Sequence, residues 1–297
     1  MKVALVNVGF GPEESELRPS PPLGIMQLAA YLRREGREVV LFDWSGEELD
    51  EAKRSALRSA DADVVGIHVK VSSVILRALE VSRWCREDGV TVIWGGPGPT
   101  TLPVMTVLQA PVDAAVLGEG EVTTSELLRA LEYGRDLATV KGIAFARDGR
   151  AIVTDRRERM VDLDSLPFPW WEGLGNLSRY LVPLHGRNAV PIVTSRGCPG
   201  RCGFCYAQNM WGGRWHALSP SRTLDAMEHV LSLDDRIGGF LIIDDLFYAS
   251  PERIREICRG IKERGLDIVW NCEIRADLVR PELLSEMKDA GCRQVLI

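Results

Sequence analysis

Along residues 1–135, short apolar runs alternate with amphipathic segments, and few folds accommodate this rhythm. The apolar runs are nearly continuous and rich in Val, Ile and Leu, as expected for parallel strands that are buried on both faces. The rhythm therefore predicts an α/β domain that is doubly wound, like the flavodoxin and Rossmann folds. The expected strands are residues 3–8, 39–42, 64–69, 90–94 and 114–117, and the clearest expected helices are residues 25–34 and 74–86.

The turns that follow several of these strands are rich in glycine. Parallel α/β sheets bind ligands beyond the carboxyl ends of their strands, and glycine lets a ligand approach the backbone closely. Ordinary turn chemistry explains any single loop equally well, but several such turns at one sheet edge favour a ligand crevice. The fingerprint G-x-G-x-x-G is absent after the first strand, which disfavours a dinucleotide dehydrogenase. The candidate residues are Gly9, Ser72, Gly95, Gly96, Gly118 and Glu119.

The composition disfavours several classes of protein. With 36 Lys and Arg against 42 Asp and Glu, the formal net charge is −6, so the chain lacks the basic footprint of a nucleic-acid-binding protein. No apolar run reaches the ~18 residues that a membrane span requires. Gly9, Gly11 and Pro12 interrupt the apolar N-terminus, which favours a first strand over a signal peptide. The seven cysteines are an odd number with three of them clustered, so we expect a reducing, cytoplasmic environment.

Residues 136–187 are expected to connect two domains. Residues 141–155 have the pattern of a β-hairpin with its turn at Asp148 and Gly149. The two prolines within residues 162–171 then block regular structure, as in an interdomain connector. Trp170 and Trp171 could face a substrate, but packing at a domain interface is favoured.

The most specific motif is a group of three cysteines with the spacing C-x3-C-x2-C, formed by Cys198, Cys202 and Cys205. Three thiolates on one loop can hold three irons of a 4Fe–4S cluster and leave the fourth iron open to an outside ligand. A zinc site would need a fourth ligand, for which His216 is the nearest candidate. A disulfide would leave one cysteine over and suits a reducing compartment poorly. The remaining cysteines better fit buried structural thiols: Cys85, Cys258, Cys272 and Cys292.

These three cysteines, with the aromatic Phe204 before the last of them, resemble the cluster loop of the radical S-adenosylmethionine (SAM) enzymes. The resemblance implies a 4Fe–4S cluster whose open iron is chelated by SAM. It also implies reductive cleavage of SAM to methionine and a 5′-deoxyadenosyl radical. The aromatic at the position of Phe204 would then lie near the adenine.

The pattern that flanks the cysteines fits part of the (β/α) barrel of that family. Barrel active sites lie where the strands end, and here those ends carry Asp244, Asp245, Glu273 and Arg275. By resemblance, Asp244 or Asp245 would contact the methionine amino group, and Glu273 and Arg275 the ribose or carboxylate. The alternatives are a turn or helix cap for the aspartates and a structural ion pair for the other two. The expected strands are residues 191–195, 240–243, 268–272 and 294–297, and the expected helices are residues 224–233, 251–264 and 281–290.

The order of an α/β domain, a hairpin connector and a radical barrel resembles the subgroup of cobalamin-binding radical SAM enzymes. The loops that carry this resemblance are residues 21–24, 95–97, 118–121 and 164–169. The resemblance implies that the glycine-rich turns of residues 1–135 bind cobalamin. Two features depart from related patterns, since the D-x-H-x-x-G motif of cobalamin mutases is missing and Gly98 stands where members often have a histidine. The first loop, residues 7–15, has no histidine, so no protein ligand is expected on the lower face of the cobalt.

The expected function is cobalamin-dependent methyl transfer to an unactivated carbon. The alternatives are a radical cyclase or rearrangement enzyme of the same architecture, and a cobalamin-free iron–sulfur module whose first domain binds a partner or stabilises the fold. The expected partners are a small-molecule or peptide substrate and an electron donor such as flavodoxin or ferredoxin. Residues 188–297 supply only about four strands, and the last apolar strand would leave an open sheet edge. We therefore expect a fragment of a longer enzyme that alone is inactive or unstable.

Overall fold

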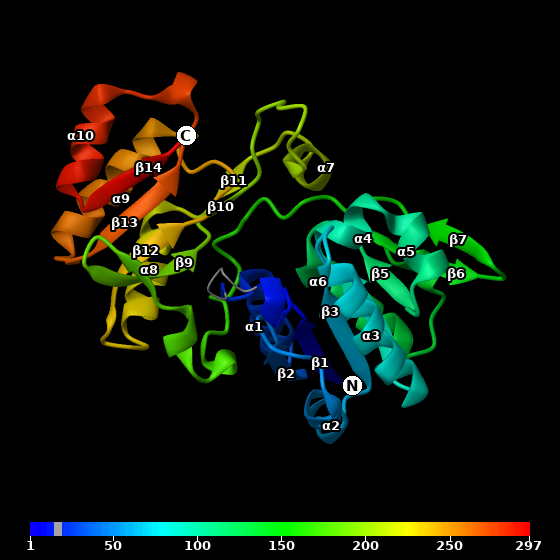
Figure 1. The fold of residues 1–297 in the computed structure, drawn as a ribbon. Coiled ribbons are helices and arrows are strands. Elements are labelled where there is room, and N and C mark those ends of the chain that lie inside the picture. Colours follow the sequence, from blue (N-terminus) through cyan, green and yellow to red (C-terminus); the bar gives the residue numbers. More distant parts are fainter. Residues whose placement is uncertain (15–19) are drawn as a thin grey trace. The chain divides into compact units, whose positions relative to one another are not determined.

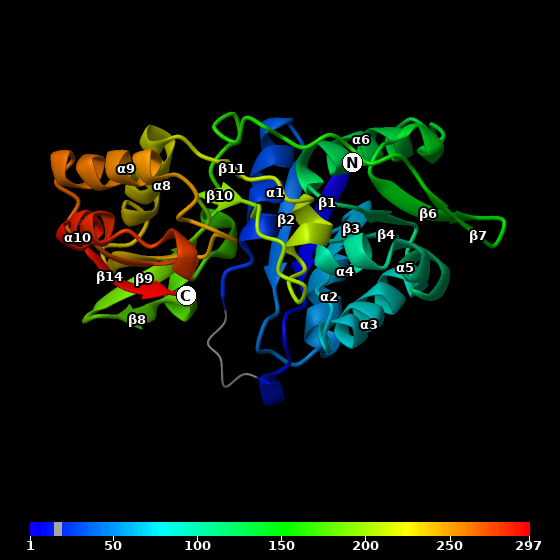
Figure 2. The same ribbon diagram turned by 90° about the horizontal axis from the view of Figure 1, so that it is seen from above.

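The computed structural model describes residues 1–14 and 20–297, which form two compact units (Figures 1 and 2). The first unit comprises residues 1–160 and 167–174, and the second comprises residues 161–166 and 175–297. Ser15, the last residue of the expected loop at residues 7–15, lies outside the described residues.

The first unit is built on a sheet with the strand order β2-β1-β3-β4-β5-β6-β7. Strands β1 to β5 are parallel, whereas β6 and β7 run antiparallel to their neighbours. The expected doubly wound α/β fold is therefore confirmed. The strand bounds are β1 Lys2–Asn7, β2 Glu38–Asp43, β3 Val64–His68, β4 Thr91–Gly95, β5 Ala114–Val116, β6 Ile143–Arg147 and β7 Arg150–Val153.

Helices cover both faces of this sheet (Figure 1). The side chains of β1 show the cause, because Val3 and Leu5 join one buried cluster while Ala4 and Val6 join another. The first cluster includes residues of α1 and α6, and the second includes residues of α2 and α3. A side chain of this size contributes about 1.5–3 kcal/mol when fully buried. The helix bounds are α1 Leu23–Arg34, α2 Glu51–Ser59, α3 Val74–Glu87, α4 Pro97–Thr101, α5 Pro103–Gln109 and α6 Gly120–Glu132.

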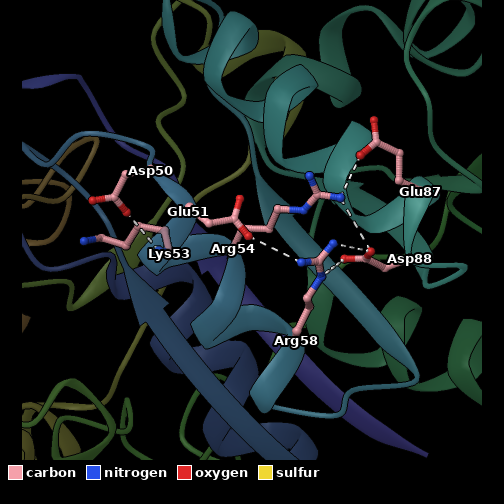
Figure 3. A network of polar contacts seen from close by, with 7 residues as sticks. All are labelled: Asp50, Glu51, Lys53, Arg54, Arg58, Glu87 and Asp88. Carbon is pink, nitrogen blue, oxygen red and sulfur yellow. Dashed lines mark hydrogen bonds and ion pairs between the residues drawn. The ribbon is translucent and has the colours of Figure 1, made fainter.

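Ion pairs join helix α2 to the end of α3 (Figure 3). The guanidinium of Arg58 donates hydrogen bonds from Nε and Nη2 to the two carboxylate oxygens of Asp88, both at 2.8 Å. Nη2 of Arg54 donates to Oε2 of Glu87 at 2.7 Å. The hydrogen bond from Arg58 holds the pKa of Asp88 below its usual range. Asp50 caps the start of α2 by accepting a hydrogen bond from the Lys53 amide. Because the network is exposed, it aligns the two helices but adds little stability.

The expected hairpin forms, but it belongs to the first unit. Strand β6 pairs with β5 in the register Ala115↔Ala144, so the sheet continues through the hairpin and the compact unit extends to residue 160. The hairpin therefore joins the edge of the first sheet instead of belonging to a connector over residues 136–187. Trp171 is buried, and the guanidinium of Arg33 lies 3.9 Å from the ring centroid of Trp170. Both tryptophans therefore pack within the fold.

The second unit has a five-stranded sheet of order β14-β13-β12-β9-β8. All neighbours are parallel except β8 and β9, and Figure 2 shows helices α8, α9 and α10 on one side of this sheet. This repeated β/α arrangement confirms the expected partial barrel. Its elements are β8 Val182–Leu184, β9 Arg187–Ile192, α8 Pro220–Leu231, β12 Ile237–Ile242, α9 Pro251–Glu263, β13 Val269–Glu273, α10 Pro281–Asp289 and β14 Cys292–Leu296.

Two short strands lie outside that sheet. The expected strand at residues 191–195 is broken, so that β9 ends at Ile192 and a separate strand, β10 Ser195–Arg196, follows. Strand β10 pairs with β11 His216–Ala217, and the short helix α7 Ala207–Trp211 lies between them in sequence. Among the described residues, no helix is both long and apolar enough to cross a membrane.

Candidate functional site

The three cysteines lie on a loop whose two ends are held together. The antiparallel pair of β10 and β11 closes the base, with Arg196 opposite His216. Within the loop Cys198 is partly buried, while Cys202 and Cys205 are exposed. None of these three cysteines forms a disulfide in this structure.

The backbone of this loop is organised around Cys198. The amide of Gly200 donates a hydrogen bond to the Cys198 sulfur at 3.3 Å, and the Gln208 side chain donates to the carbonyl of Gly200. The Cys205 amide donates to the carbonyl of Cys202 at 3.1 Å. Across residues 1–14 and 20–297, no three His, Cys, Asp or Glu side chains converge closely enough to hold a metal ion. The donor set nevertheless fits a 4Fe–4S cluster, because three accessible or partly accessible thiols and an N–H···S hydrogen bond share one short loop.

Gly197 sets the direction in which the chain enters the loop. Its φ is +89°, a conformation that favours glycine, and a Cβ there would lie 2.0 Å from the carbonyl oxygen of Arg214. Any side chain at this position would therefore force the loop away from the β10–β11 base.

We expect Gly197→Ala to lower iron uptake and to destabilise the second unit by about 1–3 kcal/mol, through backbone strain and the backbone clash. Iron per chain after anaerobic reconstitution and the free energy of unfolding in denaturant measure the two effects. Gly203→Ala is the matched control, because a Cβ at Gly203 meets nothing within 4 Å. Equal iron content in the two variants would show that the backbone conformation at Gly197 does not affect iron binding.

Asp244 is buried and its carboxylate is occupied by hydrogen bonds within the protein. Its carboxylate is 1% exposed and accepts hydrogen bonds from the Thr194 amide (2.6 Å), the Thr194 hydroxyl (2.7 Å) and the Ser195 hydroxyl (2.7 Å). The pKa of Asp244 is raised, because the effect of burial exceeds the opposing effects of these hydrogen bonds and of the charge of Arg253. These hydrogen bonds stabilise the irregular backbone between β9 and β10, directly before the cysteine loop.

Asp245 is placed differently. It is half-buried and accepts a hydrogen bond from the Gly197 amide at 2.9 Å. Partial loss of solvent around its carboxylate raises the pKa of Glu273, and the charge of Asp245 raises it further. The pKa of Tyr206 is likewise raised by burial, then by Asp245 and Cys205. Asp245, Glu273 and Tyr206 therefore form one electrostatically coupled group beside the cysteine loop.

Arg275 also lies beside this loop. Its Nε and Nη2 donate to the two carboxylate oxygens of Asp277 at 3.0 and 2.9 Å. Its Nη1 lies 2.5 Å from where a Cβ of Gly200 would be, so the guanidinium packs directly against Gly200. The pKa of Arg275 is raised mainly by Asp277, with smaller contributions from Cys198 and Cys202. Arg275 thus forms its ion pair with Asp277 and not with the expected partner Glu273. Phe204, on the cysteine loop, is 95% exposed.

The strand ends of the first unit form a second polar cluster. The Asn7 side-chain amide donates to Asp43 Oδ1 and to Ser45 Oγ, both at 2.8 Å. The side-chain oxygen of Asn7, Oδ1, lies 3.4 Å from Nδ1 of His68. Gly9 has a φ of +51° and packs so closely on Ser45 that no side chain would fit.

His68 is not among the residues expected at this site. The signal for it was its position next to the end of the expected strand at residues 64–69, and the observed strand β3 ends at His68. Burial lowers the pKa of His68 to about 4, with a smaller effect from Lys70, so the imidazole is neutral at pH 7.

The remaining glycine-rich turns have different surroundings. Gly96 has a φ of +103° and packs on His68, whereas a Cβ at Gly118 would meet nothing within 4 Å and would occupy open space. The Gly118 amide donates to Thr100 at 3.0 Å. The Glu119 carboxylate accepts a hydrogen bond from the Met160 amide at 2.9 Å. For the two other candidates, Gly95 ends β4 and Ser72 lies just before α3.

Comparison with known proteins gives consistent matches. Residues 18–128 match the family model described as the B12 binding domain. An uncharacterized methyltransferase of Pyrococcus horikoshii is 31% identical over 99% of this chain and 65% of its own length. An anaerobic magnesium-protoporphyrin IX monomethyl ester cyclase of Rubrivivax gelatinosus is 29% identical over 98% of this chain and 54% of its own length. The chain thus spans only part, 54% to 65%, of these two relatives.

Two solved structures share the fold over 99% of this chain. One is the cobalamin-dependent SAM radical enzyme OxsB with aqua-cobalamin and SAM bound, with a TM-score of 0.81, 22% identity and 43% of that chain covered. The other is the radical SAM methyltransferase TsrM of Kitasatospora setae, with a TM-score of 0.79, 21% identity and 58% of that chain covered.

Proposed function

The chain belongs to the family of cobalamin-binding radical SAM enzymes, and from this premise we propose that it methylates an unactivated carbon. One observation carries the proposal. The cysteine loop, Asp245, Glu273 and Arg275 lie together at the carboxyl ends of the partial barrel, on the same chain as a B12-binding domain.

The proposal assigns the following roles in the second unit. Cys198, Cys202 and Cys205 would hold the 4Fe–4S cluster, which supplies an electron for cleavage of SAM. Asp245 is the candidate partner of the methionine ammonium, because Asp244 already accepts three protein hydrogen bonds. Arg275 is oriented by Asp277 and would neutralise a carboxylate with its remaining amino group.

In the first unit the strand ends would bind cobalamin, which carries a methyl group when bound. The open space over Gly118 and the absence of a side chain at Gly95 suit a large flat ligand. Glu119 would hold the backbone at this edge of the sheet in place, through the hydrogen bond that it accepts from the Met160 amide. The substrate is proposed to be a small molecule or peptide, and the electron donor a flavodoxin or ferredoxin.

Radical ring formation is the second candidate, since one of the relatives is named as a cyclase. Product analysis separates the two. Methyl transfer of this type consumes two SAM molecules, one to give S-adenosylhomocysteine and one to give 5′-deoxyadenosine. Ring formation would give 5′-deoxyadenosine without S-adenosylhomocysteine.

The testing experiment is anaerobic reconstitution with iron, sulfide and hydroxocobalamin, followed by gel filtration and absorbance spectroscopy. We expect both a cobalamin band and iron–sulfur absorbance to elute with the chain. With SAM and a strong reductant, methylcobalamin and 5′-deoxyadenosine should both form. An intact cluster without a cobalamin band would instead support a cobalamin-free module and reject the methylation proposal.

A further inference from the structure

The hairpin of β6 and β7 leaves one edge of the first sheet unpaired. Strand β7 is the last in the order of this sheet, so no strand of the described residues covers its outer edge. Its inner edge pairs with β6, and the Thr154 amide donates to the Ile143 carbonyl at 2.9 Å. Main-chain groups alternate in direction along an antiparallel strand, so those of Ile152, like those of Thr154, face β6. The amides and carbonyls of Ala151 and Val153 therefore face outward, where a further strand can pair with them.

Helix α5 carries exposed apolar side chains close to this edge. The helix packs on β5, β6 and β7, and the ribbon views show it beside the hairpin (Figures 1 and 2). Val107 is buried against the sheet, whereas Val104, Met105 and Leu108 are between 43% and 49% exposed and line a hollow of about 520 Å³. The side chain of Val153 lies on the same face of the sheet and is 46% exposed. Exposed apolar side chains therefore extend on this face as far as the free edge.

A second copy of the chain matches both features, because antiparallel pairing of a strand with itself is two-fold symmetric. Two β7 strands can pair with Ala151 of each copy opposite Val153 of the other, which uses the outward main-chain groups of both. The two-fold axis then lies beside Ile152 and is perpendicular to the sheet, so the two sheets join with the same faces on the same side. Both α5 helices therefore lie on one side of the joined sheet, where their apolar side chains can pack together.

Charge favours this register. Pairing Ala151 with Val153 of the second copy places Asp148, in the turn, near Arg156 of that copy. Asp148 and Arg156 are exposed, and within residues 1–14 and 20–297 neither side chain has an ion-pair or hydrogen-bond partner. A shift of the pairing by two residues away from the turn would instead place Arg150 opposite Arg156. Like charges directly opposite each other destabilise a strand pair, whereas opposite charges stabilise it.

The opposite shift, toward the turn, gains less. It brings Arg147 opposite Asp155, but Arg147 is already ion-paired with Asp136 in its own chain. It also moves Val153 opposite Gly149, which removes a cross-strand contact between side chains.

We propose that the chain forms a symmetric dimer in which the partner is a second copy, joined through the β7 edge and the exposed face of α5. The two seven-stranded sheets then form one continuous sheet. This assembly covers a strand edge that would otherwise be free to pair with other chains. The inference concerns assembly and does not depend on the reaction that the chain catalyses.

The first test uses the whole chain without substitution, under reducing conditions that keep the exposed thiols from cross-linking. Sedimentation velocity over a range of concentrations should show a monomer–dimer equilibrium. Amide hydrogen exchange in a peptide covering residues 149–155 should slow as the dimer forms, because the outward amides of Ala151 and Val153 become hydrogen-bonded. A peptide from β1, which is paired on both edges, should show no change. A chain that stays monomeric, or whose exchange in residues 149–155 is independent of concentration, would overturn the proposal.

A charge exchange tests the register. Asp148→Lys places like charges together twice in the dimer and should raise its dissociation constant by at least about tenfold. Adding Arg156→Glu restores opposite charges and should recover most of the lost affinity. The strain of lysine at this position, where φ is +51°, is common to the single and the double variant, so their comparison isolates the charge. A folded double variant that dimerises no better than the single variant would overturn the proposed register.

A pair of helix substitutions tests the α5 face. Leu108→Glu would bury a charge between the two α5 helices and should abolish the dimer. Leu76→Glu is the matched control, because Leu76 is 70% exposed on α3 of the same unit, outside the proposed surface. Denaturant unfolding establishes that each variant folds. Dimerisation of Leu108→Glu with wild-type affinity would overturn the role of α5, and loss of the dimer in Leu76→Glu would place the interface elsewhere.

Discussion

Replacing Cys202 with alanine is expected to remove the iron and abolish SAM cleavage while leaving the fold intact. Two thiolates hold a 4Fe–4S cluster poorly, so iron should fall from about four atoms per chain to less than about one. SAM cleavage should fall by at least about a hundredfold, equivalent to about 2.7 kcal/mol. Because the Cys202 side chain is exposed, its loss creates no cavity and should not lower the free energy of unfolding.

Cys258→Ala is the matched control for this prediction. Cys258 is 2% exposed within α9, and burial raises its pKa to about 12, so it is an inert structural thiol. We expect this variant to keep its iron and lose about 1 kcal/mol of stability through the removed buried atom. For both variants, iron analysis measures the cluster content, 5′-deoxyadenosine measures SAM cleavage, and denaturant unfolding measures stability. A Cys202→Ala protein that still cleaves SAM would contradict the cluster assignment.

The elements of the fold were largely predictable because each has a local cause. The parallel strands are continuous apolar runs, and the expected strand at residues 64–69 differs from β3 Val64–His68 by one residue. Helix α9 begins where expected, because Ser250 caps the Arg253 amide and Pro251 occupies the first turn. Periodicity and capping are properties of neighbouring residues, so the sequence alone reveals them.

Long-range pairing was not predictable in the same way. The hairpin was recognised, but its pairing with β5 depends on Ala115 meeting Ala144, which no local pattern encodes. The separation of β9 from β10 depends on a carboxylate about 50 residues further along the chain. The contact between His68 and Asn7 could not be predicted for the same reason, because the two residues lie on different strands.

The candidate site shows the same limit at Asp244 and Asp245. The cysteine spacing fixed the position of the loop in the sequence, but the two neighbouring aspartates were equivalent as candidates for SAM binding. The structure separates them, because the two carboxylates have different hydrogen-bond partners. Asp244 points inward to Thr194 and Ser195, whereas Asp245 contacts Gly197 at the start of the cysteine loop.

Replacing each aspartate with asparagine should therefore affect a different property, stability for Asp244 and SAM affinity for Asp245. Asp244→Asn places an amide N–H₂ among three buried donors, and we expect it to cost about 3–5 kcal/mol of unfolding free energy. Asp245→Asn keeps the size of the side chain and should leave stability within about 1 kcal/mol. It removes the charge proposed to pair with the methionine ammonium, so SAM affinity should fall by about 10- to 100-fold.

Denaturant unfolding of both variants, and SAM binding to the anaerobic cluster-loaded chain by equilibrium dialysis, measure these effects separately. Glu273→Gln is a useful third variant, because Glu273 is exposed and electrostatically coupled to Asp245. If Glu273 contacts the ribose, this variant should weaken SAM binding without changing stability. Wild-type SAM affinity in Asp245→Asn would remove Asp245 from the site. Because burial prevents Asp244 from replacing it without rearrangement of the loop, the amino-group contact would then have to come from another strand end.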